Sequence, residues 1–323
     1  MQIFKSPNFN FVRWRWHAIV LSVIVIGIGV ATVLTRGLPL GVEFEGGTIV
    51  ILKFEQEPDL GAIRTALAAG VPAGDDAIVQ RYDEPERNEV MIRVANVGAE
   101  TGGELSRTAE AVVEALQTAN VGAFTTVGTE IVGPIVGNQL KRQGMLATIL
   151  ALAGILVYIA IRFQFSFAVG AVVAAVHDLL VTLTFLALFQ YDMTLNVIAG
   201  ILTIVGYSVN DTIVIFDRVR ENMRAMRRDR LDHIVNVAVN QTLARTIITA
   251  GTTLLAVTAL FLFGGEVLRG FAFTMIVGVI AGTYSTVFIA AAIAILWQGR
   301  RPLRGQTVTA SQPTERRRRA RAS

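Results

Sequence analysis

The chain contains no cysteine, which excludes a disulfide framework, a thiol nucleophile and a cysteine metal site. Its three histidines, His17, His177 and His233, are too scattered for their spacing to suggest a metal cluster. None of its three lysines follows a glycine, so the phosphate-binding loop GxxxxGK[ST] is absent. We therefore expect no metal site, no cofactor and no ATP hydrolysis by such a loop.

Charged residues are also scarce, at 17% of the 323 residues, whereas 53% are hydrophobic. The apolar residues form unbroken runs of about 18 to 25, the length that a helix needs to cross a bilayer. These runs lie at 18–36, 144–161, 167–190, 194–216, 246–264 and 270–297. No A-x-A cleavage pattern follows the first run, so we expect a retained anchor rather than a signal peptide. The sequence predicts a polytopic α-helical membrane protein with six transmembrane helices.

The distribution of charge predicts the orientation of these helices. Segment 37–140 holds 16 acidic and 6 basic residues, whereas the rest of the chain holds 9 acidic and 23 basic residues. Most of the positive charges outside 37–140 lie in 1–17, at Arg162, between Arg218 and Arg230, and in 299–323, which fall on one side of a six-span protein; Lys141 and Arg142 break the pattern. The positive-inside rule makes that side cytoplasmic, with both termini, and places the 37–140 domain in the periplasm. The basic tail 299–323 is most simply a disordered cytoplasmic segment; attraction to anionic membrane lipids is a second interpretation.

Segment 37–140 carries the pattern of a small α+β domain. Strands are predicted at 47–55, 77–82, 88–95 and 123–132, and amphipathic helices at 59–70 and 104–120. The order β-α-β-β-α-β suggests a ferredoxin-like sandwich, and its acidic residues look like solvated surface. In the membrane region 141–298, segment 217–244 is charged and then amphipathic. It is expected to form a cytoplasmic helix along the membrane surface.

One carboxylate lies inside a predicted membrane helix, in the stretch "GYSVNDTIVIFDRVREN". Asp211 follows Asn210, and Ser208 shares its helical face. A carboxyl group near mid-membrane costs about 2.5–3.5 kcal/mol to insert, so it normally faces protein or water. Asp211 is therefore either a hydrogen-bonded group that joins helices or a titrating group in an ion path. We favour a proton path, and a carboxylate would serve sodium equally well.

Arg245 stands at the start of the fifth predicted span, and Thr249 and Thr252 follow it at helical spacing. An arginine at this depth either extends to the lipid headgroups or reaches a carboxylate on the adjacent helix. The threonine stripe favours an ion pair with Asp211 that lines a wet cavity. Such a pair would keep Asp211 charged until a proton arrives.

His177 and Asp178 lie near the middle of the third span. Adjacent helical residues point about 100° apart, so they cannot both face one partner, and a metal site is disfavoured. Hydrogen bonding between helices is the first interpretation for both, and a relay role for Asp178 is the second. An intramembrane aspartyl protease with Asp178 and Asp211 as its dyad is a further alternative. Its usual YD and GxGD signatures are absent.

Several stretches occur in the order typical of one family. They are "GVEFEGGT", which contains Gly41, Glu43, Gly46 and Gly47, then "GPIVGNQL", "AAVHDLLVTL", "GYSVNDTIVIFDRVREN", "ARTIITAGTTLLAVTALFLFGG" and "LRGFAFTMIVGVIAGTYSTVFIA". In these stretches the chain resembles the SecF family, the smaller membrane subunits of bacterial SecDF protein-export complexes. One departure is Glu43, where the family usually has aspartate.

The resemblance implies one six-helix half of a resistance-nodulation-division fold in the bacterial inner membrane, with SecD as the other half. It implies a non-enzymatic role in protein export with the SecYEG channel and the SecA-driven translocase, acting on an unfolded polypeptide and using the proton gradient. Asp211 and Arg245 match the family residues implicated in proton movement. No feature points to nucleic acid. A small-molecule or lipid exporter half of the same superfamily is the alternative, although an outer domain of about 100 residues is small for it. A passive scaffold is another.

Overall fold

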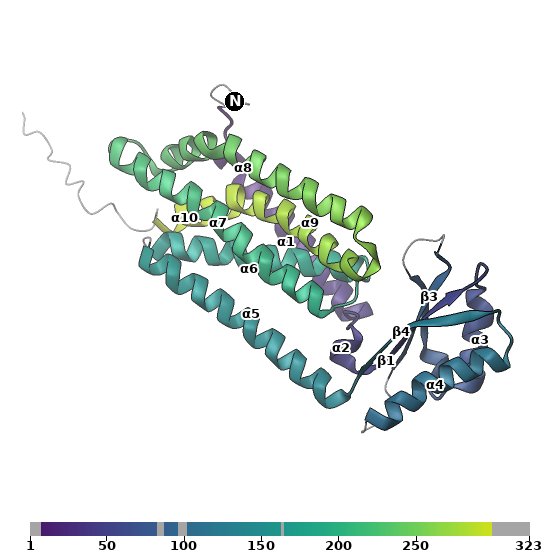
Figure 1. Cartoon of the computed structure of the whole chain (residues 1–323). Helices are drawn as coiled ribbons and strands as arrows, with labels where there is room; N and C mark the ends of the chain where they lie inside the picture. The colour runs from purple at the N-terminus through teal and green to yellow at the C-terminus, as the bar shows by residue number, and fades with distance from the viewer. Residues whose placement is uncertain (1–7, 83–86, 96–101, 163–164, 299–323) are drawn as a thin grey trace, which may run out of the picture.

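The structure, a computed structural model, describes residues 8–82, 87–95, 102–162 and 165–298. The basic tail therefore lies outside the described residues. Six helices in the described part are long and apolar enough to cross a membrane, which confirms the predicted number of spans. They form one bundle, and the α+β domain lies beyond one end of it (Figure 1).

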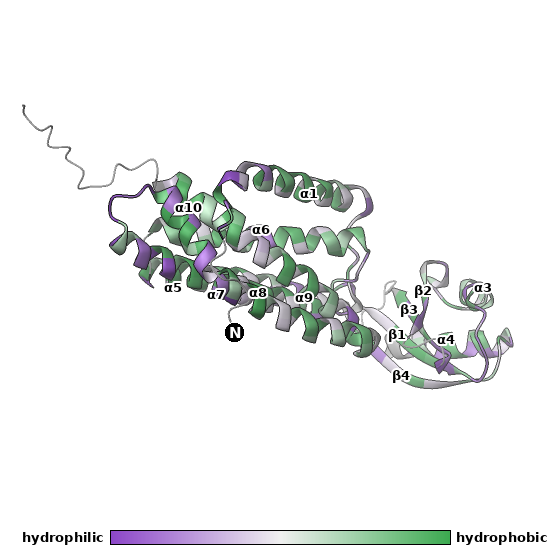
Figure 2. Cartoon of the chain, turned by 90° about the horizontal axis from the view of Figure 1, so that it is seen from above, coloured by the Kyte–Doolittle hydropathy of each residue, from purple (hydrophilic) through white to green (hydrophobic). Residues whose placement is uncertain are grey.

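The membrane helices have the following bounds. They are α1 (Arg15–Arg36), preceded by the short η1 (Val12–Trp14), α5 (Pro134–Arg162), α6 (Phe165–Leu188), α7 (Leu195–Ala225), α8 (Leu231–Phe263) and α9 (Gly265–Ser285). The last span continues from α9 through the π-helical η4 (Thr286–Ala290) into α10 (Ala291–Gln298). Figure 2 shows hydrophobic residues along these helices and hydrophilic residues gathered toward several of their ends.

Two helices extend past the expected boundaries. Helix α5 begins at Pro134, within the segment 37–140 assigned to the outer domain. Residues 217–244 do not form a separate surface helix, because 217–225 continue α7 and 231–244 begin α8. Charged side chains do not interrupt a helix whose backbone bonds are intact. The extension is held by Gln241, whose side-chain oxygen accepts hydrogen bonds from Asn222 Nδ2 at 2.9 Å and Arg218 Nε at 2.6 Å.

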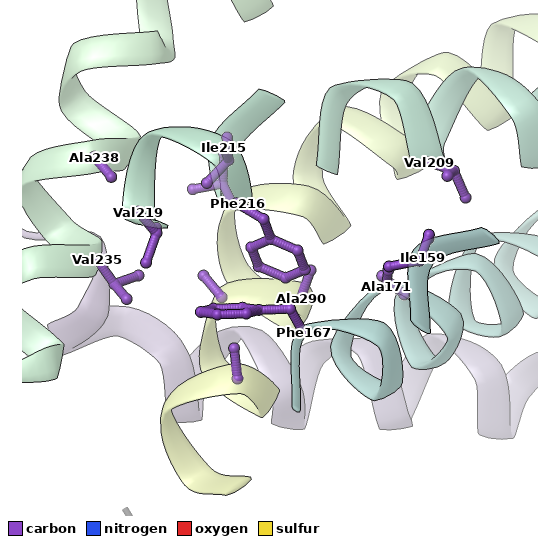
Figure 3. Close-up of a cluster of buried hydrophobic side chains, with 14 of the residues drawn as sticks. Ile159, Phe167, Ala171, Val209, Ile215, Phe216, Val219, Val235, Ala238 and Ala290 are labelled. Carbon is purple, nitrogen blue, oxygen red and sulfur yellow. The ribbon is translucent and has the colours of Figure 1, made fainter. Parts of the chain in front are cut away.

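Burial differs strongly among the spans. Of the most apolar window in α6 and in the last span, 56% and 61% are buried, whereas α5 and α8 reach only 6% and 11%. At the end of the bundle away from the outer domain, the rings of Phe167 and Phe216 lie 4.9 Å apart within a cluster of small apolar side chains (Figure 3). The chain thus has an apolar centre, and α8 is left largely uncovered.

The outer domain has the predicted order of elements. They are β1 (Gly47–Phe54), α3 (Leu60–Gly70), the short η2 (Gly74–Asp76), β2 (Ile78–Tyr82), β3 (Glu89–Ala95), α4 (Gly102–Thr118) and β4 (Phe124–Val132). The strands pair antiparallel in the order β2-β3-β1-β4, as in the ferredoxin-like sandwich predicted from the sequence. Asp59 caps α3 by accepting from the N–H groups of Gly61 and Ala62. The helices cover one face of the sheet over a core that includes Leu52, Ile92 and Leu116.

Candidate functional site

Asp211 lies in a polar seam between α7 and α8. Its carboxylate accepts a hydrogen bond of 3.0 Å from the Thr246 hydroxyl, and its side chain is half-buried. One turn along α7, the Tyr207 side chain lies near Thr249 and Thr253 of α8. Because residues four apart share a helical face, these contacts line up along both helices. The seam is the polar stripe that the threonines of the fifth span indicated.

Asp211 and Arg245 both belong to the described residues, but they do not form the expected ion pair. The ion pairs that do form among these residues have N···O distances within 4 Å. The Arg245 side chain is exposed at the surface of the helix bundle, although its charge still acts on Asp211 at longer range. The reason is helical geometry: Thr246 points at Asp211, so the preceding residue points about 100° away. Asn210, Thr249 and Thr252 are also exposed. The seam thus opens onto a polar surface of α7 and α8.

Asp178 is the centre of a second, fully buried polar cluster. Its Oδ2 atom accepts hydrogen bonds from Ser208 Oγ of α7 at 2.5 Å and Ser285 Oγ of α9 at 2.8 Å. Its Oδ1 atom lies 2.9 Å from His177 Nδ1, and His177 Nε2 lies 2.8 Å from Ser22 Oγ of α1. Asp178 and His177 therefore contact each other and face different helices. The cluster connects four of the six spans by hydrogen bonds between helices.

The sixth span supplies polar partners that the sequence analysis did not single out. Ser285 binds Asp178, and the buried hydroxyls of Thr286 and Thr212 lie 3.2 Å apart. Ser285 is the last residue of α9 and Thr286 the first of η4, and single π-helical turns occur often at functional positions. The signal was the run "GTYST" at 282–286, a glycine and four hydroxyl-bearing residues in an otherwise apolar helix.

The glycine-rich stretch after α1 forms the connection to the outer domain. It folds into the one-turn helix α2 (Val42–Glu45), followed by Gly46 and Gly47 at φ 78° and 145°, which favour glycine. Gly41 donates its N–H to the Met193 carbonyl at 2.7 Å, and an added Cβ would lie 2.8 Å from that oxygen. The Glu43 side chain lies beside Gly41. The glycines therefore allow the turns and the close backbone packing of this connection.

A charged cluster beside this connection was not expected. Arg93 of β3, whose side chain is only 8% exposed, forms ion pairs with Glu45 Oε2 at 2.9 Å and with Asp192 Oδ2 at 3.1 Å. Burial raises the pKa of Asp192, Arg93 lowers it, and Glu45 and Glu43 raise it further. The pairing joins residues 99 positions apart in two differently folded regions. No local pattern in the sequence indicates it.

Comparison with known proteins identifies the family. Residues 111–300 match the family model described as protein export membrane protein SecD/SecF, C-terminal, and residues 32–58 match the SecD/SecF GG motif. The protein translocase subunit SecF of Rhodothermus marinus is 42% identical over 317 residues, covering 96% of this chain and 100% of the relative. The chain belongs to the SecF family. The SecF of Pseudomonas aeruginosa is also 42% identical, over 91% of this chain and 92% of its own length.

Solved structures agree with this assignment. The crystal structure of SecDF, a translocon-associated membrane protein from Thermus thermophilus, matches with a TM-score of 0.79 and 33% identity over 91% of this SecF-family chain. SecDF in its super-membrane-facing form matches with a TM-score of 0.67 and 32% identity. The chain spans 39% and 40% of those SecDF chains. The predicted family and membrane fold are thus confirmed, and the chain is a subunit of the Sec protein-export machinery. The roles of individual residues stay predictions.

Proposed function

We propose that this chain is the SecF half of a SecD–SecF unit that uses the proton motive force to promote late steps of protein export across the bacterial inner membrane. Asp211 is the proton-carrying group, and Arg245 its electrostatic partner. The observation that carries the proposal is the position of Asp211: half-buried, in a polar seam, beside a polar surface that the described part of the chain leaves uncovered.

The uncovered surface supports a protein partner. An exposed arginine and the exposed Asn210 and Thr252 are unfavourable against lipid, since polar groups in a bilayer normally face protein or water. The SecDF structures contain more than twice the length that this chain covers. SecD is therefore the partner we propose for the α7–α8 surface. Covered in this way, the seam would be enclosed, and charges within it would interact more strongly than in water.

The proposed cycle needs only a modest energy per proton. A charge that crosses the membrane gains about 2.3 kcal/mol per 100 mV, which is enough to bias an equilibrium between two states of similar free energy. Protonation of Asp211 discharges it, weakens its attraction to Arg245 and favours another packing of α7 on α8. That change moves the outer domain, which holds a polypeptide emerging from SecYEG after SecA has started it. Both termini are cytoplasmic in this scheme.

The test is Asp211→Asn in inverted vesicles that carry the full complex. We expect ATP-driven export of a secreted precursor to continue, while its stimulation by a proton gradient falls by about tenfold or more, as for loss of an essential group. Asp217→Asn is the matched control, because Asp217 is an exposed acid on the same helix. Unchanged stimulation in Asp211→Asn would leave only the passive-scaffold interpretation. Stimulation of the unchanged protein by a sodium gradient but not by a proton gradient would reassign the coupling ion.

A further inference from the structure

The outer domain and the bundle meet around the short loop between α6 and α7. This loop, residues 189–194, is paired with the linker after α1: Gly41 N–H donates to the Met193 carbonyl at 2.7 Å, and Met193 N–H donates to the Pro39 carbonyl at 2.8 Å. Leu40 and Met193 form a parallel bridge. These bonds fasten the loop to the linker, which comes before the sheet. They do not by themselves hold the sheet.

Arg93 makes the contact between the sheet and this loop. It lies on β3, paired with Ile49 of β1 and Ile78 of β2, so it belongs to the central part of the sheet. Its guanidinium donates to Asp192 on the loop, to Glu45 on α2 and to the Leu40 carbonyl on the linker. One buried side chain of the sheet therefore binds three segments: the loop, α2 and the linker.

The loop is also placed to report movement within the bundle. It directly joins α6, which carries Asp178, to α7, which carries Asp211. At about 1.5 Å per residue, Asp211 is roughly 24 Å along α7 from the loop, and Asp178 about 15 Å along α6. A helix transmits a shift over such distances as a rigid element. Any sliding or rotation of these helices displaces Asp192, and with it the partner of Arg93.

We propose that Arg93 is the positioning residue that couples the outer domain to the α6–α7 loop, holding the sheet against the bundle and making it follow the loop when α6 and α7 shift. The coupling of this movement to export rests on the proposed function. The holding of the sheet does not.

Space around the contact is consistent with a joint that opens and closes. A cleft of about 390 Å³ lies between the open face of the sheet and the end of the bundle. Ile51, Met91 and Glu130 line it from the sheet, and Tyr191 and Arg269 from the bundle. Arg93 and Asp192 lie in its lining, so the sheet can tilt across the cleft once their contact is released.

The test measures the distance between the two parts directly. Because the chain has no cysteine, Gln117→Cys on α4 and Leu262→Cys on α8 place spin labels only at those two exposed positions. Distance distributions are recorded by electron–electron double resonance for the full chain in proteoliposomes. Arg93→Gln and Asp192→Ala should broaden or shift the distribution. Asp192→Asn, which keeps an acceptor oxygen, should retain the narrow one.

Arg81→Gln is the matched control, because Arg81 lies on neighbouring β2 and pairs with Glu57 at the surface, away from the bundle. Asp192→Ala breaks the same contact without changing a residue of the sheet, since Asp192 lies outside the outer domain. A changed distribution in this variant therefore does not come from misfolding of the sheet. A distribution in both Arg93→Gln and Asp192→Ala that matches Arg81→Gln would overturn the proposal. Gradient-stimulated export of the same variants is a separate measurement. If the distances change and export does not, Arg93 holds the sheet but this contact has no part in export, and Asp211→Asn remains the test of the proposed function.

Discussion

Two aspartates of the membrane region are in sharply different surroundings. Asp178 is fully buried and satisfied by Ser208, Ser285 and His177, whereas Asp211 is half-buried with one hydroxyl partner. A carboxyl group that several donors hold in place is suited to fixing helices. One with few partners beside an uncovered surface is better suited to exchange protons. The contrast supports a mainly structural role for Asp178, with its relay role as the remaining alternative.

Replacing Asp178 should therefore lower stability first. Asp178→Ala removes the acceptor shared by Ser208, Ser285 and His177, of which only Ser285 keeps another in the described part of the chain, the Gly282 carbonyl. Each buried group left unpaired costs about 1–3 kcal/mol. Asp178→Asn retains one carbonyl oxygen and should cost less. Thermal unfolding in detergent should show a clearly lower midpoint for the alanine variant. Asp217→Ala, at an exposed position, is the control. A midpoint for Asp178→Ala equal to that of the control would show that the cluster does not stabilise the bundle.

At the scale of helices and strands, close backbone contact positions the outer domain. Gly137 of α5 lies against α2, where an added Cβ would be 2.8 Å from the Phe44 carbonyl oxygen. A backbone atom cannot move aside as a flexible side chain can. The two glycine-bearing stretches before β1 and after β4 thus pack on each other. Their contact fixes where both ends of the outer domain enter the bundle.

Gly137→Ala should disrupt this contact at a cost of about 1–3 kcal/mol, the usual range for overpacking. Limited proteolysis should cleave the segment around α2 faster, and the unfolding midpoint should fall. Gly154→Ala on the same helix is the matched control, because nothing lies within 4 Å of its added Cβ. It should be neutral or stabilising by up to about 1 kcal/mol through helix propensity. Equal behaviour of the two variants would contradict the proposed role of the contact.

Patterns along the chain were sufficient to predict the elements, but not the contacts between them. Long apolar runs indicated six spans, and alternation indicated the four strands, because each follows from local burial. The end of the apolar run near 216 was not the end of α7, since charge marks where a helix leaves lipid and not where it stops. Arg245 was expected to face Asp211, yet Thr246, about 100° further round the helix, makes the contact. Arg93 and Asp192 lie in separate regions, so only the folded chain shows their pairing.

At the scale of the whole molecule, two bodies are joined at a titratable contact. Asp192 lies between them, with Arg93 facing it from β3, Glu43 and Glu45 from α2, and Glu130 and Arg269 in the same cleft. Burial is the largest influence and raises the pKa of Asp192. We call the arrangement with the sheet held against the bundle closed. A carboxyl group with a raised pKa binds its proton more tightly in this closed arrangement than in water. Closure is thus linked to pH.

The sign of this linkage makes acid favour the closed arrangement. The stabilisation is complete below the ordinary pKa of 3.8 and is lost as pH rises through the raised pKa of Asp192. Lowering the pH from about 7 to about 4 should therefore narrow the distance distribution between labels on Gln117→Cys and Leu262→Cys in otherwise unchanged protein. Asp192→Asn cannot titrate, so its distribution should change less over the same range. Because Glu43, Glu45 and Glu130 remain in that variant, the difference between the two proteins reports Asp192 alone. A wild-type distribution that instead broadens in acid, relative to Asp192→Asn, would mean that the charged pair with Arg93 outweighs the cost of burying Asp192 and would reverse the predicted direction.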